Sequence, residues 1–287
     1  MTIPYPRIPP DILHIGPLRI RWYGVMYIVG YVVGYRIIKR RVARGLLQLN
    51  PKQLDALIGY LVIGMLAGAR IMYAIAYEPG HFLHDPLAFF AIWHGGLSFH
   101  GALIGIAVAA IVFARIYHVA WWRLADTLAV AGTPGLFFGR LGNFINGELY
   151  GRVTTVPWAM VFPSDPQHLP RHPSQLYEAV VEGLVLFLAL RAFERRAASR
   201  GWYRPGLVVA LFLFGYGTFR FLLEFTRQPD TQLGFVLGPF SMGQVFCAAM
   251  VVTGAALFLA RLWRPPEEAH VAAATDLAAQ PYGARQI

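Results

Sequence analysis

The stretch SMGQVFCAAMVVTGAALFLAR, residues 241–261, decides the fold class. It carries no charged side chain before Arg261, and an α-helix needs about 20 mostly apolar residues to cross the hydrocarbon core of a bilayer. The whole chain has the same character, because 56% of its 287 residues are hydrophobic. Only 14% are charged, whereas a soluble domain carries about 25%. The sequence therefore predicts an integral membrane protein.

Six more apolar stretches precede this one. We expect transmembrane helices at 22–38, 54–77, 99–117, 124–139, 176–193, 206–225 and 241–261. The fourth stretch is weak, because glycines and Pro134 interrupt it. The apolar stretch 82–93 is too short to span and is expected at the membrane interface. The expected fold is an all-α integral membrane bundle of about seven transmembrane helices, with one domain over residues 1–264 and a mobile cytoplasmic tail over 265–287.

Glycine pairs spaced four residues apart recur in these stretches, at Gly30/Gly34, Gly64/Gly68 and Gly101/Gly105. Such spacing permits close approach of helices in lipid.

The basic residues indicate the orientation. Of the 25 Lys and Arg residues, fifteen fall on the side that includes the segments after the first, third, fifth and seventh stretches, and seven fall on the other side. The remaining three, Arg36, Arg70 and Arg220, lie within stretches. Because the side richer in Lys and Arg is normally cytoplasmic, we expect the N-terminus outside and the C-terminus inside.

Composition also narrows the classes of function. The formal net charge of +10 does not indicate nucleic-acid binding, because the basic residues lie between apolar stretches rather than on one domain. Cys247 is the only cysteine, so an intramolecular disulfide and a cysteine metal cluster are both excluded. No metal or cofactor is expected. The polar, Pro-rich start before Trp22 lacks a basic n-region and a small-residue cleavage site, so we do not expect a signal peptide.

Ionisable residues gather at the outer ends of five segments that are distant in sequence. Charged groups in a membrane are costly and usually face a cavity or a partner, so this convergence predicts a functional site. The segments contribute Tyr23; His100; Arg140, Asn143, Asn146 and Glu148; the run from Arg171 to Glu182; and Tyr216, Arg220, Glu224 and Arg227.

The segment from Gly139 to Glu148 carries the sharpest signal. In a helix, Arg140, Asn143 and Asn146 would share one face; if the glycines break the helix, the segment would be a polar loop at headgroup depth. Either form suits a phosphate, because a guanidinium can bind two oxygens and the carboxamides can donate further hydrogen bonds. The alternative, an arginine that snorkels at a helix end, leaves the asparagines unexplained.

The other segments admit structural interpretations as well. Tyr23 follows Trp22 and could belong to an interfacial aromatic belt. An Arg220–Glu224 ion pair could simply make its helix insertable. Glu178 and Glu182 fit a general base, a partner for the arginines or a structural counter-charge, and the sequence leaves these open. His100 is flanked by glycines that let the backbone approach a ligand closely, which favours function.

At these residues the chain closely resembles the prolipoprotein diacylglyceryl transferases of bacterial inner membranes. The resemblance extends from Gly16 to the seventh stretch, and the run from Arg140 to Gly151 is its most specific part. One departure is His94, where many members carry an acid, so no carboxylate role is expected there. The matching runs are 95–101 (GGLSFHG), 139–151, 171–178 (RHPSQLYE), 216–230 and 241–244 (SMGQ).

The resemblance implies a reaction and a set of roles. The diacylglyceryl group of phosphatidylglycerol would move to the lipobox cysteine thiol of a prolipoprotein, with release of glycerol phosphate, as the first step of bacterial lipoprotein maturation. The implied location is the bacterial inner (plasma) membrane, as a multi-pass protein whose partners are this lipid, membrane lipid and the prolipoprotein signal peptide. The implied catalytic residues are His100, Arg140, Arg220, Tyr23 and Glu148. The implied phosphatidylglycerol-binding residues are Arg140, Asn143, Asn146, Gly151, Arg220, Glu224 and Arg227.

The main alternative is a transporter for an anionic metabolite that uses Arg140 and Arg220 as its binding site. Such a transporter favours inverted repeats and a midplane site, and the sequence indicates neither.

Overall fold

The structure is a computed structural model that describes residues 2–6, 8–15, 18–76, 78, 82, 85–91, 95–228, 235–237 and 240–265. His94 and almost all of the tail expected at 265–287 lie outside these residues. The backbone contacts divide the chain into two compact units, Met1–Leu46 with Ala125–Ile287, and Leu47–Leu124.

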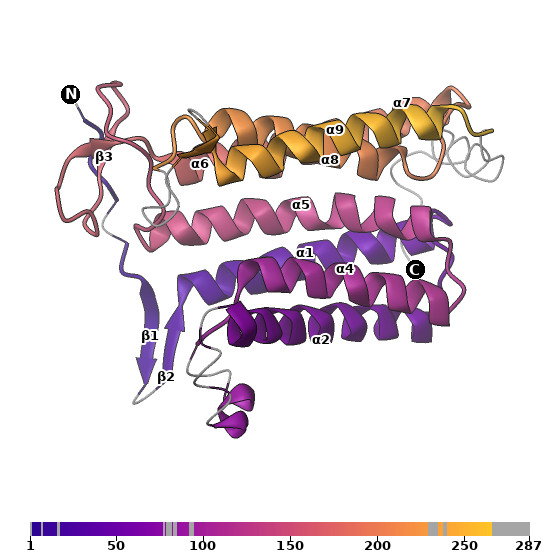
Figure 1. Cartoon of the computed structure of the whole chain (residues 1–287), viewed down its shortest axis with the longest axis horizontal. Coiled ribbons are helices and arrows are strands. Elements are labelled where there is room, and N and C mark those ends of the chain that lie inside the picture. The colour runs from indigo at the N-terminus through magenta and orange to yellow at the C-terminus, as the bar shows by residue number, and fades with distance from the viewer. Residues whose placement is uncertain are drawn as a thin grey trace, which may run out of the picture. The chain divides into compact units, whose positions relative to one another are not determined.

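The first unit is built from long helices that run alongside one another (Figure 1). Its core contains Val130, Leu186, Leu190, Tyr203 and Val208, each at most 2% exposed. The helices are α1 (Trp22–Ala43), α5 (Trp121–Ile145, which enters this unit at Ala125), α6 (Ser174–Glu178), the π-helix η3 (Ala179–Val185), α7 (Leu186–Ser199), α8 (Leu207–Leu223) and α9 (Met242–Leu262).

The glycines and Pro134 that weaken the fourth apolar stretch do not break its helix, because α5 runs through Pro134 to Ile145. A proline inside a helix removes the hydrogen bond to the carbonyl four residues earlier, here that of Val130. The Thr133 hydroxyl donates to the Val130 carbonyl oxygen at 2.9 Å instead. The helix therefore loses little at Pro134 and carries Arg140 and Asn143 on its last turns.

The segments α6, η3 and α7 form one continuous helix with a π-helical middle. The residues at both junctions, Glu178 and Val185, have helical backbone angles. A Cβ added to Gly183 would lie 2.5 Å from the Phe137 Cβ, so only glycine lets η3 approach α5 this closely. π-helical turns inside α-helices are frequent at functional sites.

Small residues also bring α1 and α5 together in the first unit. A Cβ on Gly30 would lie 3.2 Å from the Gly135 Cα, and one on Gly34 would lie 3.0 Å from the Ala131 carbonyl oxygen. The close packing expected at this glycine pair is therefore present.

The second unit pairs α2 (Pro51–Ala76) with α4 (Phe99–Ile116). Gly64 and Gly68 face Gly101 and Gly105, and an added Cβ on Gly105 would overlap the Gly64 carbonyl oxygen. The short 3₁₀ helix η1 (Pro86–Phe90) lies in the stretch expected at the membrane interface. The Arg70 side chain donates to the carbonyl oxygens of Phe89, Ala88, Gly95 and Gly96 at 2.6–2.9 Å.

Within the described ranges, three short two-stranded antiparallel sheets accompany the helices, and the all-α expectation did not include them. Their strands have two to five residues, too short for alternation to be read from sequence. They are β1 (Asp11–Ile15) with β2 (Leu18–Arg21), β3 (Met160–Val161) with β4 (Pro170–Arg171), and β5 (Phe235–Leu237) with β6 (Phe240–Ser241).

A helix is present at each of the seven apolar stretches, and the chain is mostly helical. Among the described residues, Pro51–Ala76 and Met242–Leu262 are long and apolar enough to cross a membrane. His100–Ile116 and Leu207–Leu223 are shorter apolar helices. These features fit an all-α membrane protein.

Candidate functional site

Arg140 lies near the C-terminal end of α5 and is held on one edge. Its Nε lies 2.7 Å from Glu178 Oε2, and its Nη1 donates weakly to Asn143 Oδ1 at 3.4 Å. The Glu178 side chain is 1% exposed, whereas that of Arg140 is 20% exposed. Glu178 thus occupies the Nε edge of the guanidinium, and a guanidinium held on one edge can bind a second anion with its terminal nitrogens.

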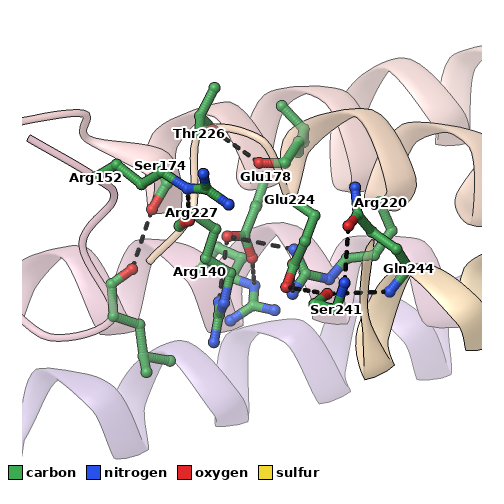
Figure 2. A network of polar contacts seen from close by, with 12 residues as sticks. Arg140, Arg152, Ser174, Glu178, Arg220, Glu224, Thr226, Arg227, Ser241 and Gln244 are labelled. Carbon is green, nitrogen blue, oxygen red and sulfur yellow. Dashed lines mark hydrogen bonds and ion pairs between the residues drawn. The ribbon is translucent and has the colours of Figure 1, made fainter. Parts of the chain in front are cut away.

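Glu178 is the common partner of three arginines, one from α5 and two from the segment at the end of α8 (Figure 2). Besides Arg140, Arg227 Nη1 lies 3.3 Å and Arg220 Nη1 lies 3.9 Å from Glu178 Oε1. One buried carboxylate therefore holds three guanidinium groups together. Without this carboxylate, the three guanidinium groups would repel one another. A cluster of guanidinium groups is suited to the binding of a phosphate.

A second chain of contacts fixes Arg220 from the other side (Figure 2). Arg220 Nη2 lies 2.9 Å from Glu224 Oε2, which is the ion pair expected from their spacing on α8. The Ser241 hydroxyl donates to Glu224 Oε1 at 3.0 Å. Ser241 also caps α9 in a reciprocal pair with Gln244, so the SMGQ run anchors α9 and orients Glu224.

The two asparagines bind Glu148. Asn143 Nδ2 donates to Glu148 Oε1 at 2.8 Å, and Asn146 Nδ2 donates to the same oxygen at 3.3 Å. The buried Gln175 side chain holds the Glu148 carbonyl oxygen at 2.6 Å. Each asparagine amide thus donates one of its two hydrogens to Glu148. Both asparagines orient the exposed Glu148 carboxylate, so not all of their donors are available to a ligand.

Gly151 lies where two backbone segments meet. Its N–H donates to the His172 carbonyl at 2.8 Å, and an added Cβ would overlap the Thr226 carbonyl oxygen. The neighbouring Arg152 donates from Nε to the Arg227 carbonyl at 2.7 Å. Gly151 therefore lets the 146–173 loop approach the end of α8, close to Arg227.

A buried ion pair stabilises this loop from within. Arg171 Nε lies 2.5 Å from Asp165 Oδ2, and Arg171 Nη2 lies 3.0 Å from Asp165 Oδ1. The Arg171 guanidinium, helped by backbone N–H groups, holds the pKa of Asp165 at about 2, below its usual range. Burial lowers the pKa of His172. The Arg171–Asp165 pair thus links two parts of the loop that carries Glu148.

Tyr23 and Tyr216 also belong to the first unit. The Tyr23 ring lies against Gly142, where an added Cβ would come within 2.9 Å of Cδ2, and its hydroxyl bonds with that of Tyr27 at 3.0 Å. Four of the five segments expected to converge therefore meet in this unit.

His100 belongs to the second unit. It lies in the first turn of α4, which the Ser98 side chain caps, and its side chain is exposed. Gly95 and Gly96 precede it with φ of +89° and +74°. A Cβ on Gly96 would lie 2.6 Å from Arg70 Nη1. The catalytic role of His100 remains a prediction.

Glu178 was not among the candidate catalytic and binding residues, but of the alternatives left open for it the structure shows one, a partner for the arginines. Its spacing from Glu182 was visible in the sequence, but nothing within its own helix indicated three arginine partners. Within the described residues no group of three or more His, Cys, Asp or Glu side chains could hold a metal ion. The cluster is chemically suited to an oxyanion.

Comparison with known proteins agrees with this chemistry. Residues 10–260 match the family model described as prolipoprotein diacylglyceryl transferase. A Bordetella bronchiseptica protein named phosphatidylglycerol–prolipoprotein diacylglyceryl transferase is 47% identical over 263 residues, covering 91% of this chain and 98% of its own.

Proteins of the same name from other bacteria match similarly. The Geobacter sulfurreducens protein is 48% identical over 251 residues, 87% of this chain and 94% of its own. The Methylococcus capsulatus protein is 45% identical over 258 residues, 89% of this chain and 96% of its own. These matches support a transferase and not the transporter alternative. The chain therefore belongs to the prolipoprotein diacylglyceryl transferase family.

Proposed function

We propose that this protein transfers the diacylglyceryl group of phosphatidylglycerol to the lipobox cysteine thiol of prolipoproteins and releases glycerol phosphate. The observation that carries the proposal is the cluster of Arg140, Arg220 and Arg227 around the buried Glu178. A cluster of this kind suits a phosphodiester at headgroup depth, and relatives with this name cover most of the chain.

The chemistry follows from the charges. The substrate thiolate attacks the glyceryl carbon that bears the phosphate ester, a C–S bond forms, and the C–O bond breaks. The electron pair leaves with the phosphate, whose negative charge grows as the bond opens. Preorganised donors directed at developing charge lower the barrier, and here Arg140 and Arg220 are those donors.

A free cysteine thiol has a pKa near 8.5, so a base or a cationic field is needed to form the thiolate. We assign His100 as the group that takes the thiol proton. Tyr23 and Glu148 are supporting candidates from the first unit, where Tyr23 packs against Gly142 and Asn143 donates to Glu148. Asn143 and Asn146 orient Glu148, while Glu224 orients Arg220.

The remaining assignments concern the membrane. We propose that residues 1–264 form one catalytic domain with seven transmembrane helices in the bacterial inner membrane, with the N-terminus outside and a cytoplasmic tail over 265–287. The Lys and Arg distribution supports this orientation. It directs the Arg140 end of α5 outward, where an exported substrate's cysteine emerges.

The deciding experiment incubates the purified full-length protein with phosphatidylglycerol and a lipobox peptide. Mass spectrometry should find a diacylglyceryl group on the cysteine and an equal amount of free glycerol phosphate. A matched peptide with serine at the lipobox position should stay unmodified. Unmodified cysteine peptide under conditions in which the protein remains folded would overturn the proposal.

A further inference from the structure

Arg70 is a buried arginine that the proposed chemistry does not use. It lies in the last two turns of α2 and is 6% exposed. A charged side chain within a membrane-spanning helix is costly and usually has a functional partner, so the contacts of Arg70 indicate its role.

The Arg70 guanidinium binds two separate pieces of the segment between α2 and α4. Nε donates to the Phe89 carbonyl at 2.8 Å, and Nη2 donates to the Ala88 carbonyl at 2.6 Å, both in η1. Nη1 donates to the carbonyls of Gly95 and Gly96 at 2.8 and 2.9 Å. Four of its five N–H groups are thus engaged. Lysine has a single terminal nitrogen and could not join the two pieces in the same geometry.

The turn at Gly95 and Gly96 fits this guanidinium closely. Both glycines have positive φ, +89° and +74°, a conformation that other residues rarely adopt. A Cβ on Gly96 would lie 2.6 Å from Arg70 Nη1 and 2.7 Å from Cε1 of the Tyr73 ring. The guanidinium also lies over the Phe82 ring, 4.9 Å from its centroid, so aromatic contacts help to hold it.

The turn that the guanidinium binds leads directly into α4. The Ser98 N–H donates to the Ala69 carbonyl of α2 at 3.0 Å, and the Ser98 side chain caps α4. His100 follows two residues later. On its other side, Gly101 packs so closely on α2 that an added Cβ would overlap the Gly68 carbonyl oxygen. The last turns of α2 therefore fix the chain on both sides of His100.

We propose that Arg70 is a positioning residue that fixes the start of α4 and thereby positions His100, the group assigned to take the thiol proton. Arg70 acts through the backbone and contacts no reacting atom. Its significance in turnover rests on the proposed function, whereas its hold on the segment before His100 can be measured without it. Because a displacement of about 1 Å can lower a rate by about 10²-fold, its loss should appear in kcat.

The test is Arg70→Lys in the full-length purified protein, which keeps the charge and removes the planar group. Hydrogen exchange read by mass spectrometry should be about tenfold faster at the hydrogen-bonded amides of Ser98, Gly101 and Ala102, because at least one charged hydrogen bond is lost. In the transfer assay kcat should fall by about 10–100-fold, while the KM for phosphatidylglycerol should stay within about twofold. Arg115→Lys, at an exposed position of α4, should change none of these quantities.

A second pair of variants tests the same contact from the other side. Gly96→Ala places a Cβ against the guanidinium and should reproduce the faster exchange and the lower kcat, even if Arg70→Lys does not fold. Gly59→Ala is the matched control on α2, because its added Cβ would meet no atom within 4 Å, and it should change neither quantity.

A His100→Gln background separates positioning from a general loss of stability. There, Arg70→Lys should lower kcat no further, because the residue that it positions is already absent. An equal loss in both backgrounds, a fully active His100→Gln protein, or faster exchange with an unchanged kcat would refute an action through His100. Unchanged exchange in both Arg70→Lys and Gly96→Ala would refute the hold itself. If the wild-type protein transfers no diacylglyceryl group, the proposed function fails, and the exchange measurement still decides whether Arg70 fixes the start of α4.

Discussion

Arg140→Lys removes the planar guanidinium group but keeps the positive charge. Arg140 binds Glu178 through Nε at 2.7 Å, and its Nη1 bonds weakly to Asn143 Oδ1 at 3.4 Å, so we expect its remaining terminal donors to bind a second anion. Lysine has one terminal nitrogen on a flexible stem, so it can reach Glu178 or a phosphate but cannot hold both in the same geometry. The variant therefore loses at least one charged hydrogen bond.

The size of the loss follows from where that bond acts. A hydrogen bond to a charged group contributes about 1.5–3 kcal/mol in a folded protein. Removal of one donor directed at charge that develops in a transition state lowers turnover by about 10²–10³-fold. Glu178 is 1% exposed and keeps Arg227 at 3.3 Å, so the Arg140→Lys variant should still fold and form the rest of the cluster. The loss of activity should therefore appear mainly as a lower kcat.

The assay compares transfer to a lipobox peptide by wild-type, Arg140→Lys and Arg195→Lys proteins at matched expression and membrane insertion. Arg195 is exposed on α7 and serves as the control for the arginine-to-lysine change itself. Arg140→Lys should fall by about 10²–10³-fold while Arg195→Lys stays active. A fully active Arg140→Lys enzyme would refute the phosphate clamp and locate the site elsewhere.

Four further predictions follow from the topology, the site and its supports. A reporter fused after Arg200 should be cytoplasmic and one inserted near Asp165 should be external; finding both on one side would contradict the orientation. Chelation with EDTA should leave transfer intact, and inhibition reversed by a divalent ion would show that the phosphate chemistry needs a metal. Cys247→Ala should retain most activity, since the substrate supplies the thiol; loss of transfer in a normally inserted protein would indicate a covalent intermediate. Asp165→Asn should lower the Tm at pH 7 by several degrees. Because the Asp165 carboxyl of the folded protein has a pKa of about 2, the Tm difference between wild type and variant should shrink as the pH falls from about 4 toward 2. A Tm difference that does not change with pH would contradict the ion pair.

The sequence alone determined where the helices lie and which chemistry to expect. Apolar length is a property of consecutive residues, so all seven stretches could be located, with ends that differ from the structure by a few residues at most of them. The run from Gly139 to Gly151 identified the family, and helical spacing correctly paired Arg220 with Glu224. The sequence could not identify the hydrogen bond from Thr133 that compensates for Pro134, because that bond depends on the rotamer of the Thr133 side chain.

Tertiary structure decided which groups from different helices share a partner. The spacing of Arg140, Asn143 and Asn146 placed them together, but only packing directed the asparagine amides to Glu148 and the Nε of Arg140 to Glu178. The π-helical geometry of η3, with Gly183 against Phe137, determines where Glu178 and Glu182 lie. Helical periodicity relates residues along one element, whereas contacts between elements depend on how close the helices approach and how they are rotated, and those are set by the packing of the whole unit.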